Sequence, residues 1–293
     1  MIDALRHFLL IVEHGTYTAA ARHAHVSQPA LTASIRRLEA QFAARLLDRG
    51  RLGASLSEAG KALLPHARAA VVAVSDGRRV VEALGRLDAG LVRIGGGQTA
   101  CTYLLPPILS AFRRKFPGVA LRLREMPEEL AVDAFEAGEL DMVVAGGTRG
   151  ERFRDEQIVL VAAPGIDART LPFIAFAPGS AVRTVMDRHF AGVPIGMELS
   201  SISTVKGSVR AGLGVALVSR TAVATDLELG RLIELKDPRT PLARPLRLLH
   251  RGVDRLSAAA RVLREMLLAA APARAKAAPR QGGGRASPRS RRA

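Results

Sequence analysis

Apolar residues near the start of the chain recur three and four positions apart, which is the spacing of one face of a helix. They predict a first amphipathic helix that ends at Gly15, a short alanine-faced helix over residues 19–24, and a tight turn at residues 25–26. The apolar positions of the first helix are Leu5, Phe8, Leu9 and Val12. The chain is therefore expected to open with two helices joined by a short connection.

A third helix is predicted directly after this turn. Ser27 stands where an N-cap belongs, and Pro29 falls in the first turn, where its missing N–H costs nothing. The apolar stripe of this helix consists of Leu31, Ile35 and Leu38. We therefore expect the segment 27–39 to pack through this stripe and to turn its polar side outward, as the second helix of a helix-turn-helix does.

The outward side of this helix has the chemistry of base recognition. Glutamine can bond adenine, arginine can bond guanine or a phosphate, and a threonine methyl can contact thymine. Because the start of such a helix reaches base edges, we expect Gln28, Pro29 and Thr32 to read bases. At least one of Arg36 and Arg37, further along, should contact the DNA backbone. The alternative is a plain helical hairpin with two solvated arginines. The outward residues are Gln28, Thr32, Ala33, Arg36 and Arg37.

Residues 46–57 have the pattern of a wing, with two short strands around a glycine-flanked tip. Arg49 and Arg51 lie beside this tip. In that place their side chains can contact phosphates or a minor groove. The wing makes the helix-turn-helix interpretation stronger than the hairpin alternative.

The stretch 59–89 is helical in period, with apolar residues at alternating steps of four and three. Such a heptad-like stripe predicts a partner helix, and Gly77 fills the missing position of the seam. The alternative is that the stripe packs on its own chain. Pro65 should bend the helix near its start, because proline removes one backbone hydrogen bond. The stripe consists of Leu63, Ala67, Ala70, Val74, Val81 and Leu84.

From residue 91 to about residue 268, short β-branched runs alternate with helical segments, which is the pattern of an open α/β sheet. A glycine loop at 95–97 separates a strand at 91–94 from a helix that runs through 105–116. Such a loop exposes N–H groups that can hold an anion, and Thr99 and Thr102 add hydroxyl donors. The loop lacks the Lys-Ser/Thr pair of a P-loop.

Composition narrows the class of protein. The 293 residues suffice for two or three domains. The net charge is +16, but it falls to +9 without the basic tail 271–293, which we expect to be disordered. The net charge is therefore compatible with a DNA partner but is not by itself an argument for one. The single cysteine, Cys101, excludes a disulfide framework and a thiolate metal cluster. With no signal peptide and no apolar span evident, we expect a cytoplasmic protein that does not bind membranes.

The chain resembles the LysR-type transcriptional regulators over nearly its whole length except the tail. The resemblance implies an α/β fold class with an all-α winged helix-turn-helix N-terminal domain, followed by an effector domain of two α/β lobes that resembles a type 2 periplasmic binding protein. The segments that carry it, in order, are 15–21, 26–32, 35–39, 56–60, 103–106, 138–141 and 209–218.

The resemblance also implies a division of the chain. The winged helix-turn-helix takes 1–58, the linker or dimerisation helix 59–89, the effector-binding domain 90–270 and the tail 271–293. Lobe I takes about 90–161 and 251–270, and lobe II about 162–250. The lobes are joined by strands crossing near 157–163 and 245–250, and the helix 257–268 returns to lobe I.

Functional positions of the family carry over residue by residue. Implied DNA contacts are Thr18, Ser27, Gln28, Pro29, Thr32, Ala33, Arg36, Arg37, Arg49 and Arg51. Relatives often have arginine where this chain has Ala33, so one of their DNA contacts is absent here. Implied effector-binding residues are Gly97, Thr99, Thr102, Ser200 and Ser201, with Phe176, Pro178 and Ser180 beside them. Hydroxyls near a helix dipole suit a carboxylate or other anionic ligand.

The sequence therefore predicts a regulator that binds double-stranded promoter DNA and a small-molecule effector. It would act as a homodimer through the linker helix, or as a homotetramer, without a metal, a cofactor or catalytic residues. One alternative is an α/β enzyme with Cys101 as nucleophile, but we can assign no histidine to activate it. The other is a solute-binding module with a helical N-terminal extension, and in transport such a module would need an export signal.

Overall fold

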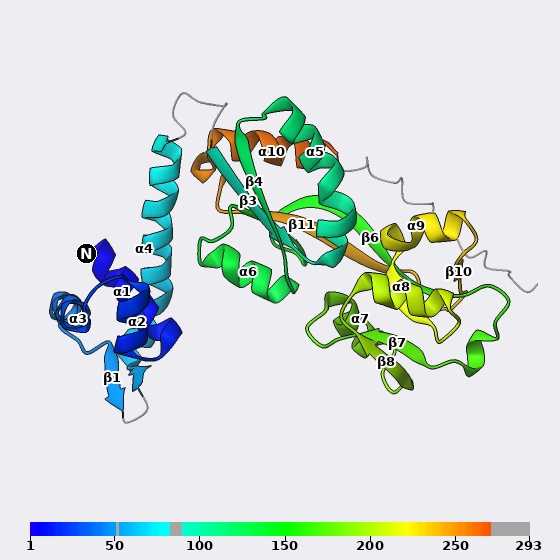
Figure 1. Ribbon diagram of the computed structural model, residues 1–293, viewed down its shortest axis with the longest axis horizontal. Helices are drawn as coiled ribbons and strands as arrows, with labels where there is room; N and C mark the ends of the chain where they lie inside the picture. Colours follow the sequence, from blue (N-terminus) through cyan, green and yellow to red (C-terminus); the bar gives the residue numbers. More distant parts are fainter. Residues whose placement is uncertain (51–52, 83–89, 271–293) are drawn as a thin grey trace, which may run out of the picture.

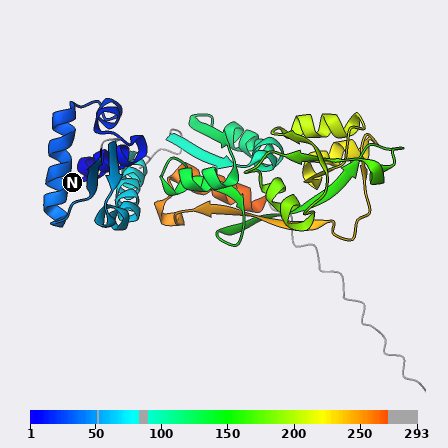
Figure 2. The same cartoon turned by 90° about the horizontal axis from the view of Figure 1, so that it is seen from below.

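The computed structural model describes residues 1–50, 53–82 and 90–270. The N-terminal head, the first lobe and the second lobe follow one another along the long axis of the molecule (Figures 1 and 2). Leu84, Arg51 and the tail, which the sequence predictions include, lie outside the described residues. Among the helices of the described part, none combines the length and apolarity needed to cross a membrane.

The head is a three-helix unit with a two-stranded wing. Gly15 ends the first helix in the left-handed conformation, at φ 69°. Thr16 and Ser27 cap the next two helices, each accepting a hydrogen bond from a backbone N–H, so the second helix begins two residues earlier than expected. The elements are α1 (Ile2–His14), α2 (Tyr17–His23), α3 (Gln28–Phe42), β1 (Leu47–Gly50) and β2 (Gly53–Leu56). The predicted stripe of Leu31, Ile35 and Leu38 is buried in their common core.

The long helix α4 (Glu58–Glu82) begins after Ser57, whose Oγ accepts a hydrogen bond from the Gly60 N–H at 3.0 Å. The two halves of its apolar stripe have different surroundings. Ala67 is buried, and Leu63 and Ala70 pack against the head core of the same chain, as the alternative interpretation had it. Val74 and Val81, further along, are 40% and 65% exposed. The expectation that the whole stripe faces a partner helix is therefore wrong for its first half.

The first lobe is built on parallel pairing of β3 with β4 and β5. Helices α5 and α10 pack with one core cluster, which contains Phe112 and Leu263, and α6 packs with another, which contains Phe135. The elements are β3 (Gly90–Gly96), a π-helical turn (Ala100–Leu104), α5 (Leu105–Lys115), β4 (Val119–Glu125), α6 (Glu128–Glu136), β5 (Met142–Gly146), a 3₁₀ turn (Val253–Arg255) and α10 (Ala258–Ala269).

The predicted glycine loop is mostly strand. Gly95 and Gly96 belong to β3, and only Gly97 follows it. A Cβ on Gly95 would lie 2.6 Å from a Leu140 methyl, and one on Gly96 would lie 2.8 Å from the Val144 carbonyl oxygen. These two glycines therefore serve close packing of the sheet and are not part of an anion-binding loop.

Two long antiparallel strands join the lobes, where the sequence places the crossings. β11 pairs with β5 in the first lobe through residues 246–250, whereas β6 pairs with β9 in the second lobe through residues 158–161. The remaining elements are β6 (Glu151–Ala162), a 3₁₀ turn (Ala168–Thr170), β7 (Phe173–Phe176), α7 (Ala181–His189), β8 (Ile195–Leu199), α8 (Ile202–Arg210), β9 (Ala216–Ser219), α9 (Arg220–Glu228), β10 (Ile233–Glu234) and β11 (Leu242–His250).

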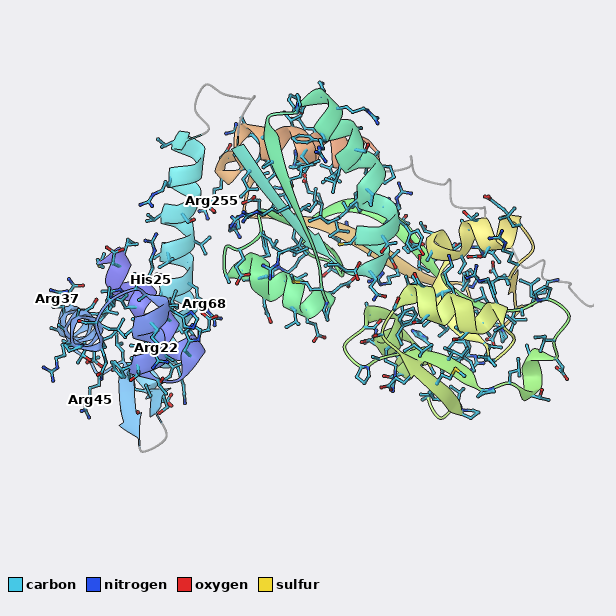
Figure 3. The ribbon with its side chains drawn as sticks, in the orientation of Figure 1. Arg22, His25, Arg37, Arg45, Arg68 and Arg255 are labelled. Atoms are coloured by element: carbon cyan, nitrogen blue, oxygen red, sulfur yellow. The ribbon has the colours of Figure 1, made fainter. Side chains whose placement is uncertain are left out.

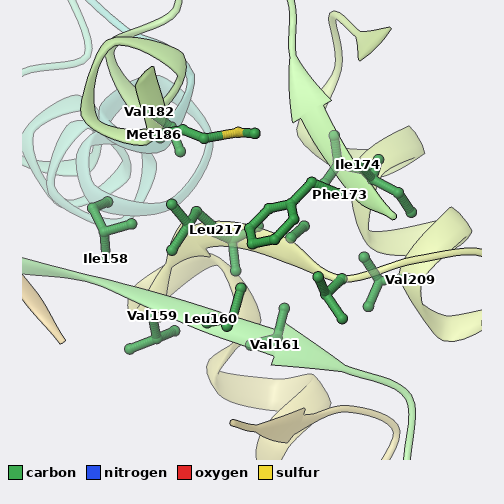
Figure 4. Packing of buried hydrophobic residues seen from close by; sticks show 14 of the residues in the cluster. Ile158, Val159, Leu160, Val161, Phe173, Ile174, Val182, Met186, Val209 and Leu217 are labelled. Carbon is green, nitrogen blue, oxygen red and sulfur yellow. The ribbon is translucent and has the colours of Figure 1, made fainter. Parts of the chain in front are cut away.

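The second lobe has its own core, in which residues of β6 meet residues of β7, β9, α7 and α8. Figure 4 shows Phe173 and Leu217 in the middle of this cluster, with Ile158 and Leu160 on the strand β6 beneath them. Because β6 belongs to both lobes, this core is anchored to the strand that leads back to the first lobe.

Candidate functional site

The polar face of α3 is open to solvent, as the sequence predicts. Thr32 is partly exposed, and Thr18 at the start of α2 is exposed. Figure 3 shows Arg37 on the outer side of α3, away from the head core. The remaining exposed positions of the predicted set are Gln28, Pro29, Ala33 and Arg36, together with the cap residue Ser27. Ser27 Oγ accepts from the Ala30 N–H at 3.3 Å, so its structural role is that of a helix cap.

The wing is fixed beside the start of α2. The Ala54 N–H donates to the Gly15 carbonyl oxygen at 2.7 Å. Gly53 lies so close to this turn that a Cβ there would stand 2.3 Å from the same oxygen. Of the two predicted wing arginines, Arg49 lies in β1. The structure does not describe its side chain, and it does not describe Arg51. The wing is therefore held against the turn between α1 and α2.

Two exposed arginines near this surface have no counterpart among the sequence predictions. Arg22 is on α2 and Arg45 immediately precedes the wing, as Figure 3 shows. Like Arg36 and Arg37, they form no ion pair within the described part of the chain. Their charges are therefore available to an anionic partner such as a phosphate backbone. No periodicity marked them, because each lies at the end of an element.

A cavity of about 320 Å³ lies between the two lobes. The first lobe lines it with residues 97–99 and 125–128, the second with residues 176–182, Ser200 and Ile202, and β11 with Arg244. Five side chains and one glycine that the sequence singled out line it together: Gly97, Thr99, Phe176, Pro178, Ser180 and Ser200.

Thr102 and Ser201 do not line this cavity. Thr102 lies one helical turn beyond Thr99 and is exposed, with its hydroxyl 3.5 Å from a carboxylate oxygen of Glu125. Ser201 caps α8, where its Oγ accepts a hydrogen bond from the Ser203 N–H at 3.2 Å. The family resemblance implied both residues as effector-binding, but neither is among the residues that line the cavity.

Arg244 is the cationic side chain of this lining, and it is already paired. Its guanidinium donates to the carboxylate of Glu128, and only 10% of the Arg244 side chain is exposed. The other carboxylate oxygen of Glu128 accepts from the Gly146 N–H at 3.0 Å. Sequence reasoning missed this pair because the two residues are 116 positions apart.

Three helices begin at the cavity. The helix that leads into α5 starts at Gln98, α7 starts after Ser180, and α8 starts after Ser201. Helix N-termini present free N–H groups and the positive end of the helix dipole. Gln98 also crosses the cleft, because its Nε2 donates to the Ser200 carbonyl oxygen at 2.7 Å. The lobes are therefore held together at the rim.

Cys101 is not an activated nucleophile. Burial and the nearby Glu125 carboxylate raise the pKa of its thiol to about 12. Its Sγ–H donates to the Gly96 carbonyl oxygen at 3.3 Å. A thiol that stays protonated neither attacks a substrate nor forms a thiolate metal ligand. No group of metal-binding residues occurs in the part of the chain that the structure describes.

Two family models match the chain. The one described as a bacterial regulatory helix-turn-helix protein of the lysR family matches residues 2–61, and the LysR substrate binding domain matches residues 85–272. The RuBisCO operon transcriptional regulator of Allochromatium vinosum is 31% identical over 288 residues, covering 91% of this chain and 95% of that protein.

Solved structures share the fold along almost the whole chain. A variant of full-length OxyR from Pseudomonas aeruginosa is similar with a TM-score of 0.64 and 19% identity, over 92% of this chain and 93% of the other. Full-length LysG from Corynebacterium glutamicum, with its effector Arg bound, is similar with a TM-score of 0.62 and 21% identity, over 92% and 97%.

Proposed function

Because the chain belongs to the LysR family of bacterial transcriptional regulators, we propose that its α3 reads promoter DNA and that a small anionic effector between the lobes modulates this binding. The family consists of regulators, so the enzyme and transport alternatives are set aside. The observation that carries the proposal is one chain with both an exposed polar recognition helix and an inter-lobe cavity.

On the DNA side, the N-terminal part of α3 supplies the base contacts. Gln28, Pro29 and Thr32 read base edges in the major groove. Arg36, Arg37 and the arginines of the wing bind the backbone, and the N-terminus of α2 at Thr18 adds a phosphate contact. Arg22 and Arg45, which are exposed and form no ion pair with the residues that the structure describes, belong to the same set of backbone contacts.

A dimer would form through the second half of α4. The exposed Val74 and Val81 lie on one face of the helix, and nothing lies within 4 Å of a Cβ built on Gly77 between them. A second copy of this helix would bury that face and place two recognition helices on half-sites about 34 Å apart or a multiple of that. Two such dimers would make the homotetramer, at work in the cytoplasm where promoter DNA lies.

On the effector side, the cavity suits a small anionic molecule. Three helix N-termini and the hydroxyls of Thr99, Ser180 and Ser200 surround it, whereas Arg244 is neutralised by Glu128. LysG, which shares the fold, is solved with a small molecule, its effector Arg, bound.

Selection from a pool of random DNA duplexes tests the DNA part. The purified chain should enrich one sequence with two related half-sites, and a chain with Arg36→Ala and Arg37→Ala should lose affinity for it. Arg113→Ala and Arg114→Ala on the first lobe together are the charge-matched control. A pool that stays random over repeated rounds would contradict the proposal.

A ligand screen by thermal shift tests the effector part. Carboxylates and phosphates of small size should raise the melting temperature and alter the affinity for the selected duplex. If only neutral or cationic compounds bind, the anionic part of the proposal fails while the DNA part stands.

A further inference from the structure

The second half of α4 touches the first lobe of its own chain with the face opposite Val74 and Val81. Val72 and Asp76, one helical turn apart, lie in this contact, and each is 5% exposed. Such depth is unusual for an aspartate, since buried charges require partners. The two residues contact different parts of the first lobe.

Val72 packs on the turn that follows α6. Gly138 has a φ of 79° there, which favours glycine, and its N–H donates to the Phe135 carbonyl oxygen at 2.9 Å. A Cβ on Gly138 would stand 2.6 Å from a Val72 methyl. Helix and turn are therefore in direct contact, with no room for any side chain at this glycine.

Asp76 pairs with Arg251, which follows β11. Arg251 Nε donates to Asp76 Oδ2 at 3.0 Å. The rest of the guanidinium is held by the first lobe, donating to the carbonyl oxygens of Phe135 and Leu140 and lying 4.8 Å from the Phe135 ring centroid. The first lobe thus holds the Arg251 guanidinium in place, and the edge that carries Nε faces Asp76 on α4.

We propose that Val72 and Asp76 form an intramolecular clamp that fixes α4, and with it the DNA-binding head, to the first lobe of the same chain. Head and first lobe then move as one body, and effector-driven closure displaces the second lobe relative to both. The clamp uses one face of α4 and leaves Val74, Gly77 and Val81 free for a second copy. It goes beyond the proposed function, which requires only that DNA and effector bind.

Spin-label distances within one chain test the clamp. Labels at Gln41→Cys on α3 and Arg113→Cys on α5 lie on exposed positions, and the native Cys101 is too buried and protonated to take a label. Labelled chain is mixed with an excess of unlabelled chain so that the distances come from one protomer. The variants are Asp76→Asn and Val72→Ala, and Asp254→Asn, an exposed acid near Arg251, is the control.

The parent and Asp254→Asn should each give one narrow distance distribution. Asp76→Asn and Val72→Ala should at least double its width and speed amide exchange over 72–78 by tenfold or more, while circular dichroism shows folded chains. A width unchanged in both variants, or broadened equally in Asp254→Asn, overturns the clamp. Val72→Ala keeps the test decisive if Asp76→Asn does not fold. Binding to the selected duplex is measured separately, since its absence would count against the proposed function alone.

Discussion

Gln28 is the residue on which base recognition by this chain depends most directly. It is exposed in the first turn of α3, and Ser27 and Pro29 on either side set the start of that helix. An amide at this place can donate to and accept from one adenine edge, which no other exposed side chain of that turn can do.

Replacing Gln28 by alanine should relax the preference for one base pair of each half-site by about 1–3 kcal/mol, because that pair loses its bidentate contact. The measurement is the affinity for the selected duplex and for its single-base variants. Gln41→Ala, on an exposed glutamine further along the same helix, should change nothing. Equal weakening on every duplex would show that Gln28 contacts the backbone.

Cys101 should be unreactive toward a thiol reagent between pH 7 and 9 in the folded chain. Its pKa is raised to about 12, so at those pH values the thiol stays protonated, and burial shields it as well. On unfolding in denaturant, the pKa returns to about 8.5 and the reaction becomes fast. Labelling with a chromogenic disulfide tests this, and rapid modification of the folded chain would refute it.

At the scale of elements, α4 contacts two parts of its own chain and leaves a third face exposed. Its first half belongs to the head core, the Val72 face contacts the first lobe, and the exposed face is the one that we propose for a second copy. The heptad pattern predicted the helix and its apolar stripe. It could not divide the stripe between the chain and a partner, because both kinds of packing require the same residues.

Val81→Glu should weaken the dimer by tenfold or more, because a carboxylate would be buried at the seam without a partner. Sedimentation at several concentrations measures the dissociation constant. Leu229→Glu, the same kind of change at an exposed leucine of the second lobe, is the control. A dimer of unchanged strength would place the interface elsewhere.

Gln98→Ala should open the cleft, because the hydrogen bond from Gln98 to the Ser200 carbonyl oxygen is lost. At about 1 kcal/mol for such a bond, the ratio of closed to open molecules should fall roughly fivefold. Small-angle X-ray scattering of the chain without effector would show a larger radius of gyration. Gln157→Ala, at an exposed glutamine of β6, should leave the radius as it is, and an equal radius in both variants would argue against this role.

At the scale of the whole molecule, the sequence predicted features that depend on local signals. It did not predict those that depend on contacts between distant residues. Caps, turns and periodicity marked α3 and the wing, since these depend on neighbouring residues, whereas the family resemblance placed the crossing strands and α10. The pair Arg244 and Glu128 joins residues 116 positions apart, and the contact between Asp76 and Arg251 spans 175. No local pattern reports such pairs, and the full lining of the cavity was therefore missed.

The same contrast applies to the glycines at the end of β3. Three in succession suggested an anion-binding loop, but two of them are required by close neighbours in the sheet. Of the predicted effector-binding residues, Gly97, Thr99 and Ser200 line the cavity, whereas Thr102 and Ser201 do not. The sequence therefore predicted which segments lie at the cleft, but not which of their side chains line the cavity.

The central claim is that α3 lies in the major groove of promoter DNA, two copies to a site. Methylation interference at guanine N7, which faces the major groove, tests it directly on the selected duplex. We predict two clusters of interfering guanines on one face of the duplex, separated by about 10 base pairs or a multiple of that. Interference confined to the minor groove, or no periodic interference at all, would contradict the account.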